Sequence, residues 1–166
     1  MVIGFRVAGL PYPQGSKRIV TFGGVPRLIN AGGSAAQKKH KAWRKAVHDS
    51  AIGAMVGYDH LTFPLDEPLE VTLTFWLPPT GDKYRTRHAT TPDIDKLARS
   101  TLDGLTTSGI IVDDSRVSVL AVSKMYGEET GCRISIHPLG TDEQNDRERL
   151  KDIAARIRKT QRQGAS

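Results

Sequence analysis

Cysteine is nearly absent from the 166-residue chain, in which Cys132 is the single example. One cysteine excludes an intramolecular disulfide, and it also excludes zinc sites built on cysteine pairs. No apolar run approaches the roughly 20 residues that a transmembrane helix requires, and residues 1–10 lack the layout of a secretory signal. We therefore expect one compact domain that works in the reducing cytoplasm, away from membranes.

Acidic residues are absent from the first 48 residues, although this segment contains nine lysines and arginines. The whole chain has a formal net charge of +6. One-sided charge of this kind is typical of proteins that bind a polyanion, most commonly nucleic acid. The alternative is a basic surface that is simply solvated.

Alternating apolar residues predict strands over residues 2–8, 69–77, 117–125 and 132–137. Residues 18–22 and 25–29 flank Gly23-Gly24 and predict a hairpin. Two helices are predicted, one from Ser34 to about Gly57 and one over residues 92–107, with Thr91 as the N-cap of the second.

This order of elements favours an α+β fold in which helices pack against a mixed sheet. The unit over residues 69–125 is a candidate crossover connection between parallel strands. Residues 141–166 are highly charged, with a weak apolar stripe, and predict a helical extension after a domain formed by residues 1–140.

Acidic residues gather around the second predicted helix. Asp93 and Asp95 lie in its first turn, and Asp113-Asp114 stand just before the next predicted strand. A basic loop over residues 83–88 precedes the helix. Carboxylates mixed with basic side chains are typical of metal-dependent phosphodiester cleavage, because hard oxygen ligands hold Mg²⁺ and cations hold the DNA backbone. Each pair also has a purely structural explanation, since helix N-termini favour acidic residues and Asp-Asp pairs are common in turns.

Taken as one unit, residues 92–114 closely resemble the core of the RusA family of Holliday-junction resolvases. The family pattern is Asp-x-Asp-Asn-x-x-Lys, then Asp-x-Leu, then Gly, then Asp-Asp before a strand. This chain has Asp93-Ile94-Asp95-Lys96, Arg99, Asp103-Gly104-Leu105, Gly109 and Asp113-Asp114, with the same distance between the first and last aspartates. The proline-containing segment 9–17 and the strand 117–125 are looser matches, so the resemblance covers roughly residues 1–137.

The resemblance implies a homodimeric endonuclease, bacterial or phage-encoded, that cuts four-way DNA junctions with Mg²⁺ or Mn²⁺. It places the metal ligands at Asp93, Asp95 and Asp114, with Asp113 as an adjacent carboxylate. We expect the three ligands to converge where the helix start meets the loop before strand 117–125. Two cations, Arg99 and Lys124, are expected to offset charge on the phosphate. The side chains expected to contact DNA are those of Lys17, Arg18, Arg85, Arg87 and Lys96.

Two positions depart from the family pattern. Lys96 stands where the family has Asn, and Arg99 stands where it has Lys. An arginine holds a phosphate but does not readily donate and recover a proton. Arg99 also lies four residues after Asp95, so an ion pair within the helix is its alternative role. Two other functions stay open: a nuclease for other branched replication intermediates, and a branched-DNA-binding protein without catalysis.

The five histidines show no metal-ligand spacing, and we expect them on the surface or in loops. His88 is the only one near the predicted site. Cys132 alternates with Ile134 and is predicted to be a buried apolar residue.

Overall fold

The computed structural model describes residues 2–15, 17–30, 33–79, 87–140 and 151. The elements are β1 (Ile3–Ala8), β2 (Lys17–Phe22), β3 (Val25–Asn30), α1 (Gly33–Val56), β4 (Leu69–Leu77), α2 (Ile94–Ser108), the short 3-10 helix η1 (Asp114–Arg116), β5 (Val117–Tyr126) and β6 (Gly131–Pro138). The predicted strands, hairpin and first two helices are confirmed to within a few residues. Apart from Lys151, the predicted C-terminal helix lies outside the described residues, and the domain boundary at residue 140 stays a prediction.

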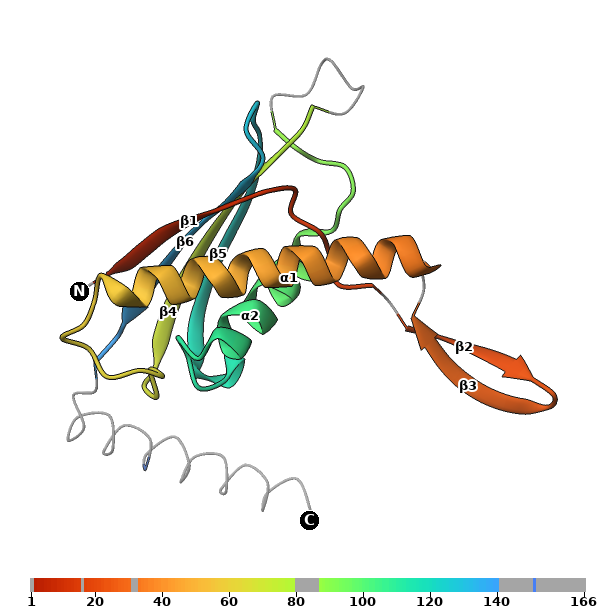
Figure 1. Cartoon of the computed structure of the whole chain (residues 1–166), viewed down its shortest axis with the longest axis horizontal. Coiled ribbons are helices and arrows are strands. Elements are labelled where there is room, and N and C mark those ends of the chain that lie inside the picture. Colours follow the sequence, from red (N-terminus) through yellow and green to blue (C-terminus); the bar gives the residue numbers. More distant parts are fainter. Residues whose placement is uncertain (1, 16, 31–32, 80–86, 141–150, 152–166) are drawn as a thin grey trace, which may run out of the picture.

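Four strands form the main sheet in the order β1-β6-β4-β5. β4 and β5 pair in parallel, whereas β6 is antiparallel to both β4 and β1. The mixed sheet is therefore confirmed, and α2 is the crossover that connects the parallel pair. β2 and β3 form a separate hairpin that stands apart from the body in Figure 1.

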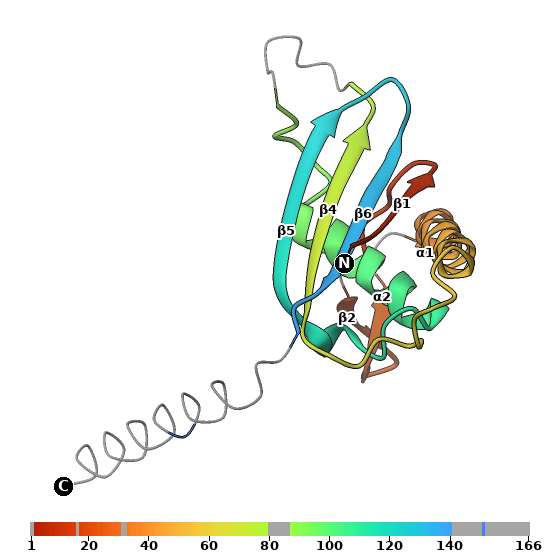
Figure 2. The ribbon, with the colours of Figure 1, turned by 90° about the vertical axis from the view of Figure 1, so that its left-hand side faces the viewer.

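Both helices lie on one side of the sheet, as Figure 2 shows. β4 alternates strictly between buried and half-buried residues, because one of its faces meets the helices. Trp43 of α1 packs against Phe75 of β4 and donates from Nε1 to the Thr101 hydroxyl of α2 at 3.2 Å. Gly104 lets the two helices approach, since a Cβ at this position would lie 2.8 Å from Val47. Cys132 is buried in this core as predicted, and burial raises the pKa of its thiol.

β5 forms an open edge of the sheet, to the left in Figure 2. It is much more exposed than β4, and its apolar residues Val119, Leu120 and Met125 are each more than 40% exposed. A long apolar edge strand presents unpaired backbone groups that are ready to pair with another strand. No helix within the described residues is long and apolar enough to cross a membrane.

The start of α2 differs from its prediction. Thr91 is not the N-cap; Asp93 takes this position, with an extended backbone (φ −64°, ψ 137°), and the helix begins at Ile94. Threonine and aspartate are both good N-cap residues, so sequence alone did not separate them. Gly109 ends the helix in the left-handed conformation, which glycine adopts without strain.

Candidate active site

The first turn of α2 presents two carboxylates and a lysine to solvent. Asp93 uses its side chain for an ion pair rather than for a capping hydrogen bond, and its Oδ2 lies 2.7 Å from Nζ of Lys96. The hydrogen bond and the positive charge of Lys96 lower the pKa of Asp93, and the same contact raises the pKa of Lys96. Asp95 lies one residue before Lys96 and is exposed.

Lys124 of β5 fixes the segment that leads into α2. Its Nζ donates to the backbone carbonyls of Thr90 and Pro92, each at 2.8 Å. Its charge also contributes to the lowered pKa of Asp93. The lysine therefore positions the helix start, in addition to the phosphate role predicted for it.

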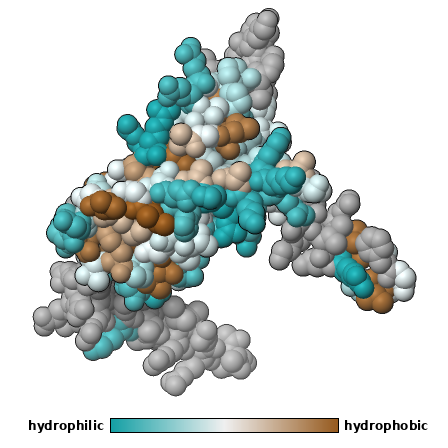
Figure 3. Space-filling model, viewed as in Figure 1, coloured by the Kyte–Doolittle hydropathy of each residue, from teal (hydrophilic) through white to brown (hydrophobic). Residues whose placement is uncertain are grey.

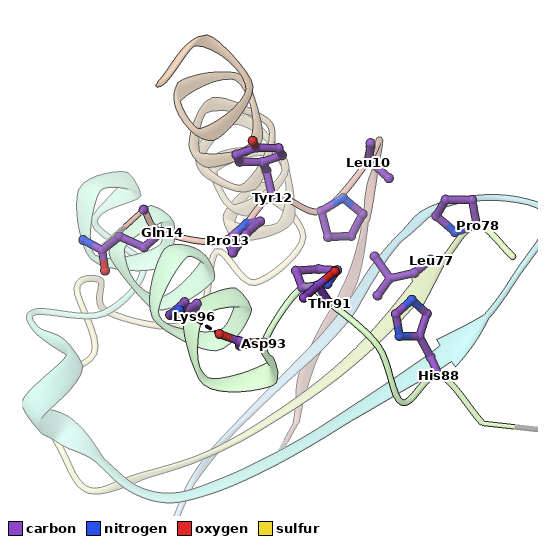
Figure 4. Close-up of a pocket in the computed structure, with 13 residues that line it drawn as sticks. Leu10, Tyr12, Pro13, Gln14, Leu77, Pro78, His88, Thr91, Asp93 and Lys96 are labelled. Carbon is purple, nitrogen blue, oxygen red and sulfur yellow. Dashed lines mark ion pairs between the residues drawn. The ribbon is translucent and has the colours of Figure 1, made fainter. Parts of the chain in front are cut away.

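The proline-containing loop after β1 packs over the same helix start. The backbone N–H of Gln14 donates to the carbonyl of Lys96 at 3.1 Å. Between this loop, the end of β4 and the start of α2 lies a pocket of about 490 Å³, whose lining includes Asp93 and Lys96 (Figure 4). The walls are mostly apolar, with several prolines.

The second carboxylate pair lies at η1, directly before β5. Asp113 accepts a hydrogen bond from the backbone N–H of Ser115 at 3.0 Å, and this contact lowers the pKa of the Asp113 carboxyl. Arg116 forms an ion pair with Asp66, which ties η1 to the segment before β4. Asp114 is exposed.

The two carboxylate pairs lie at opposite ends of α2. The 15 residues of this helix span about 22 Å. Lys124, near the end of β5, meets Pro92 at the helix start, whereas η1 precedes the beginning of β5. Among the described residues, no three carboxylate, histidine or cysteine side chains lie close enough to hold a metal ion. The expected convergence of Asp93, Asp95 and Asp114 within one chain is therefore wrong.

The predicted basic residues occupy several elements. Arg99 is exposed on α2, and within the described residues it forms no ion pair, so its alternative role, an ion pair with Asp95, is not observed. Arg87 is exposed beside the pocket segment, whereas Arg85 lies outside the described residues. Lys17 and Arg18 belong to β2. Hydrophilic side chains also lie along α1 on the face seen in Figure 3. The exposed lysines of α1 are Lys38, Lys39, Lys41 and Lys45.

His88 lies in a loop, as predicted, but it is buried there rather than on the surface, with only 5% of the residue accessible. Its ring lies 5.0 Å from that of Tyr126, centroid to centroid, and it lines the pocket beside Leu77. Burial and the nearby Lys124 lower the pKa of His88. The sequence signal for this position was weak, because a histidine in a polar segment has no periodic pattern to indicate burial.

Comparison with known proteins agrees with the pattern around α2. The sequence model of the endodeoxyribonuclease RusA matches residues 9–137, which is well over half of the chain. Both carboxylate pairs, the proline-containing loop and β5 lie inside the matched range. A comparison with curated proteins finds none that matches the chain.

Proposed function

The chain belongs to the RusA endodeoxyribonuclease family, and from this premise we propose that it resolves four-way DNA junctions by metal-dependent hydrolysis of phosphodiester bonds. The observation that carries the proposal is the Asp93–Asp95 pair on an exposed helix start, beside an exposed Arg99. Carboxylates next to a permanent cation suit the recognition of a metal and a phosphate together.

Among the described residues, a single chain does not bring these carboxylates together for a divalent cation, because Asp114 lies at the far end of α2 from Asp93 and Asp95. The donor chemistry does fit, since each end offers two carboxylates. We therefore propose a homodimer in which each site takes Asp93 and Asp95 from one chain and Asp114 of the partner subunit.

The open edge of β5 supports this arrangement. Two identical edge strands related by a twofold axis pair antiparallel, so the beginning of one β5 lies beside the end of the other. The partner's Asp114 then comes to the end at which Lys124 holds the start of α2. Val119 lies midway along the chain between Asp114 and Lys124. It is 45% exposed, and its apolar neighbour Leu120 is 43% exposed. Pairing would cover this apolar edge.

A bound Mg²⁺ or Mn²⁺ would neutralise phosphate charge and activate the attacking water. Lys96, paired with Asp93, lowers the pKa of that carboxyl and reduces the negative charge that DNA meets. Arg99 lies one helical turn after Asp95 and binds the phosphate as a permanent cation, without proton transfer. Lys124 acts mainly by holding the carbonyls of Thr90 and Pro92.

The first measurement is cleavage of a labelled four-way junction, with linear duplex and fork controls, in Mg²⁺ and in EDTA. Junction-selective nicks that require the metal are expected. Binding without cleavage would instead support a DNA-binding protein, the second candidate. One observation favours this candidate: Nζ of Lys96 lies 2.7 Å from Oδ2 of Asp93, in a position that a metal ion bound to this carboxylate would need.

Mixing inactive variants tests the shared site. Asp95→Asn and Asp114→Asn should each be inactive, yet mixed dimers should regain nicking of one strand. Such a dimer holds one site with three native aspartates and one site that carries both substitutions. Mixing Asp93→Asn with Asp95→Asn is the matched control and should restore nothing. Stable mixed dimers of the first pair without activity would place the site within one chain and reject the sharing.

A further inference from the structure

We propose that the pocket beside Asp93 receives a single DNA base, unstacked from the branch point of a bound junction, and that His88 reads the edge of this base. His88 would thus be the residue that sets base preference next to the cut. The inference rests on the proposed function, because it requires DNA at the start of α2.

The shape and chemistry of the pocket suit the flat face of a base. Figure 4 shows the side chains of Leu10, Leu77 and Pro78 with Thr91 around one end of the pocket, and His88 beside them. The lining also includes Pro11 and Pro92. Tyr12, Gln14 and Lys96 add polar groups to the lining. Mostly apolar, ring-bearing walls with polar groups among them are typical of pockets that hold a flipped base by stacking and read its edge by hydrogen bonds.

His88 supplies a polar group that lacks a partner. The residue is only 5% exposed, and its Nδ1 has no hydrogen-bond partner among the described residues. The hydroxyl of Tyr126, whose ring contacts that of His88, is likewise buried and unpartnered within the described part of the chain. Buried polar atoms are nearly always hydrogen-bonded. The unsatisfied Nδ1 of His88, a residue that lines the pocket, therefore points to a ligand that carries donors or acceptors.

The imidazole of His88 has the right protonation state for reading a base. Burial and Lys124 lower its pKa, so the ring is neutral near pH 7. A neutral imidazole offers one donor and one acceptor, as a base edge does.

The position of the pocket connects the base to the chemistry. Thr91, Pro92 and Asp93 follow one another along its lining, so a base held here belongs to a nucleotide close to the phosphate at the aspartates. Unstacking a base costs free energy in a duplex, and it costs less where the base has already lost a neighbour. A branch point offers such bases, and this explains why a junction would fill the pocket more readily than linear DNA.

The first test follows the base directly. A junction carrying 2-aminopurine at the branch point is bound by the native dimer in Ca²⁺, and fluorescence is measured. An increase is expected on binding, because unstacking relieves quenching, and the increase should be smaller for His88→Phe. This readout does not depend on cleavage. Tight binding without a fluorescence change would overturn the proposal, whatever the outcome for catalysis.

The second test measures base preference. Junctions with each of the four bases, or an abasic nucleotide, next to the mapped nick are cut under single-turnover conditions. The native chain should favour its best base over its worst by about tenfold, the usual size of one base-edge contact. In His88→Phe, which keeps a ring against Tyr126, this ratio should fall toward one. His60→Phe, at a histidine whose side chain is 61% exposed, is the control and should keep the native ratio.

Because the readout is a ratio between substrates, a general loss of rate does not imitate the effect. If His88→Phe fails to fold, His88→Gln provides the same comparison with a polar side chain. Native ratios in a folded His88 variant, or equal cutting of the abasic and intact junctions by the native chain, would reject the base pocket while leaving the nuclease proposal in place. A native chain that cuts no junction would reject the proposed function, and the fluorescence test alone would then judge the pocket.

Discussion

Lys96 lowers the pKa of the first carboxylate of the proposed site. Its hydrogen bond to Asp93 is the main reason that the pKa of this aspartate is lowered. We predict that Lys96→Ala raises the pKa of Asp93 toward the ordinary value of about 3.9. The stabilisation from this pair is present above the unfolded pKa and is lost as the pH falls through the lowered folded pKa. Carboxyl-carbon NMR titration of Asp93 measures the change.

The matched control for this titration is Lys45→Ala. Lys45 pairs with Asp49 on α1 in a similar exposed ion pair, so its removal should raise the pKa of Asp49 and leave Asp93 unchanged. An Asp93 titration that is identical with and without Lys96 would contradict the assignment.

At the residue scale, sequence identified the acidic positions but not their partners. Asp93, Asp95, Lys96 and Arg99 offer two pairings, at spacings of three and four, and both are compatible with a helix. The structure makes the first pairing, because Asp93 is the N-cap and Lys96 reaches back to it. The burial of His88 is harder to predict from sequence. It depends on the neighbouring Tyr126 and on a loop whose packing no local pattern specifies.

The start of α2 is held from a different element, through Lys124 of β5. We predict that Lys124→Met lowers the free energy of unfolding by about 1.5–3 kcal/mol, the usual range for a hydrogen bond to a charged group. Methionine keeps the length of the side chain but leaves the carbonyls of Thr90 and Pro92 without their donor. Urea denaturation of the full chain measures the loss.

Lys41→Met is the control for this stability measurement. Lys41 is exposed on α1, so its substitution should change stability by no more than about 0.5 kcal/mol. Equal stabilities of the two variants would mean that the Lys124 contacts do not hold the helix start.

At the element scale, hydrophobic periodicity predicted the strands correctly. The order of the elements along the chain did not predict which of their ends lie together in space. The alternation over residues 69–77 predicted β4 correctly because one face of that strand meets the core. The predicted convergence of the aspartates is wrong, because the two pairs lie at opposite ends of the helix that separates them in the sequence. A crossover helix runs antiparallel to the strands that it connects. The start of α2 therefore lies at the opposite end of the sheet from the segment before β5.

The exposed edge of β5 is where, in the proposed function, a single chain needs a second subunit to complete its site. We predict that Leu120→Glu converts the dimer to a monomer and removes junction cleavage, because like charges would face each other across the twofold axis. Analytical ultracentrifugation gives the assembly state. Val56→Glu is the control, since Val56 is 78% exposed on α1 and its change should leave both the assembly and the cleavage intact.

A Leu120→Glu chain that stays dimeric and active would show that the subunits meet elsewhere. Loss of the dimer with full retention of cleavage would argue that one chain assembles a working site. Only loss of both properties together agrees with a site divided between two subunits.

The single buried cysteine has a practical consequence for such experiments. Because the Cys132 thiol is enclosed in the core and its pKa is raised, very little thiolate forms at neutral pH to react with maleimides. The native sequence therefore behaves as a cysteine-free background. A fluorophore or a spin label attached to one newly introduced surface cysteine would report distances between subunits and DNA arms without any change to the native core.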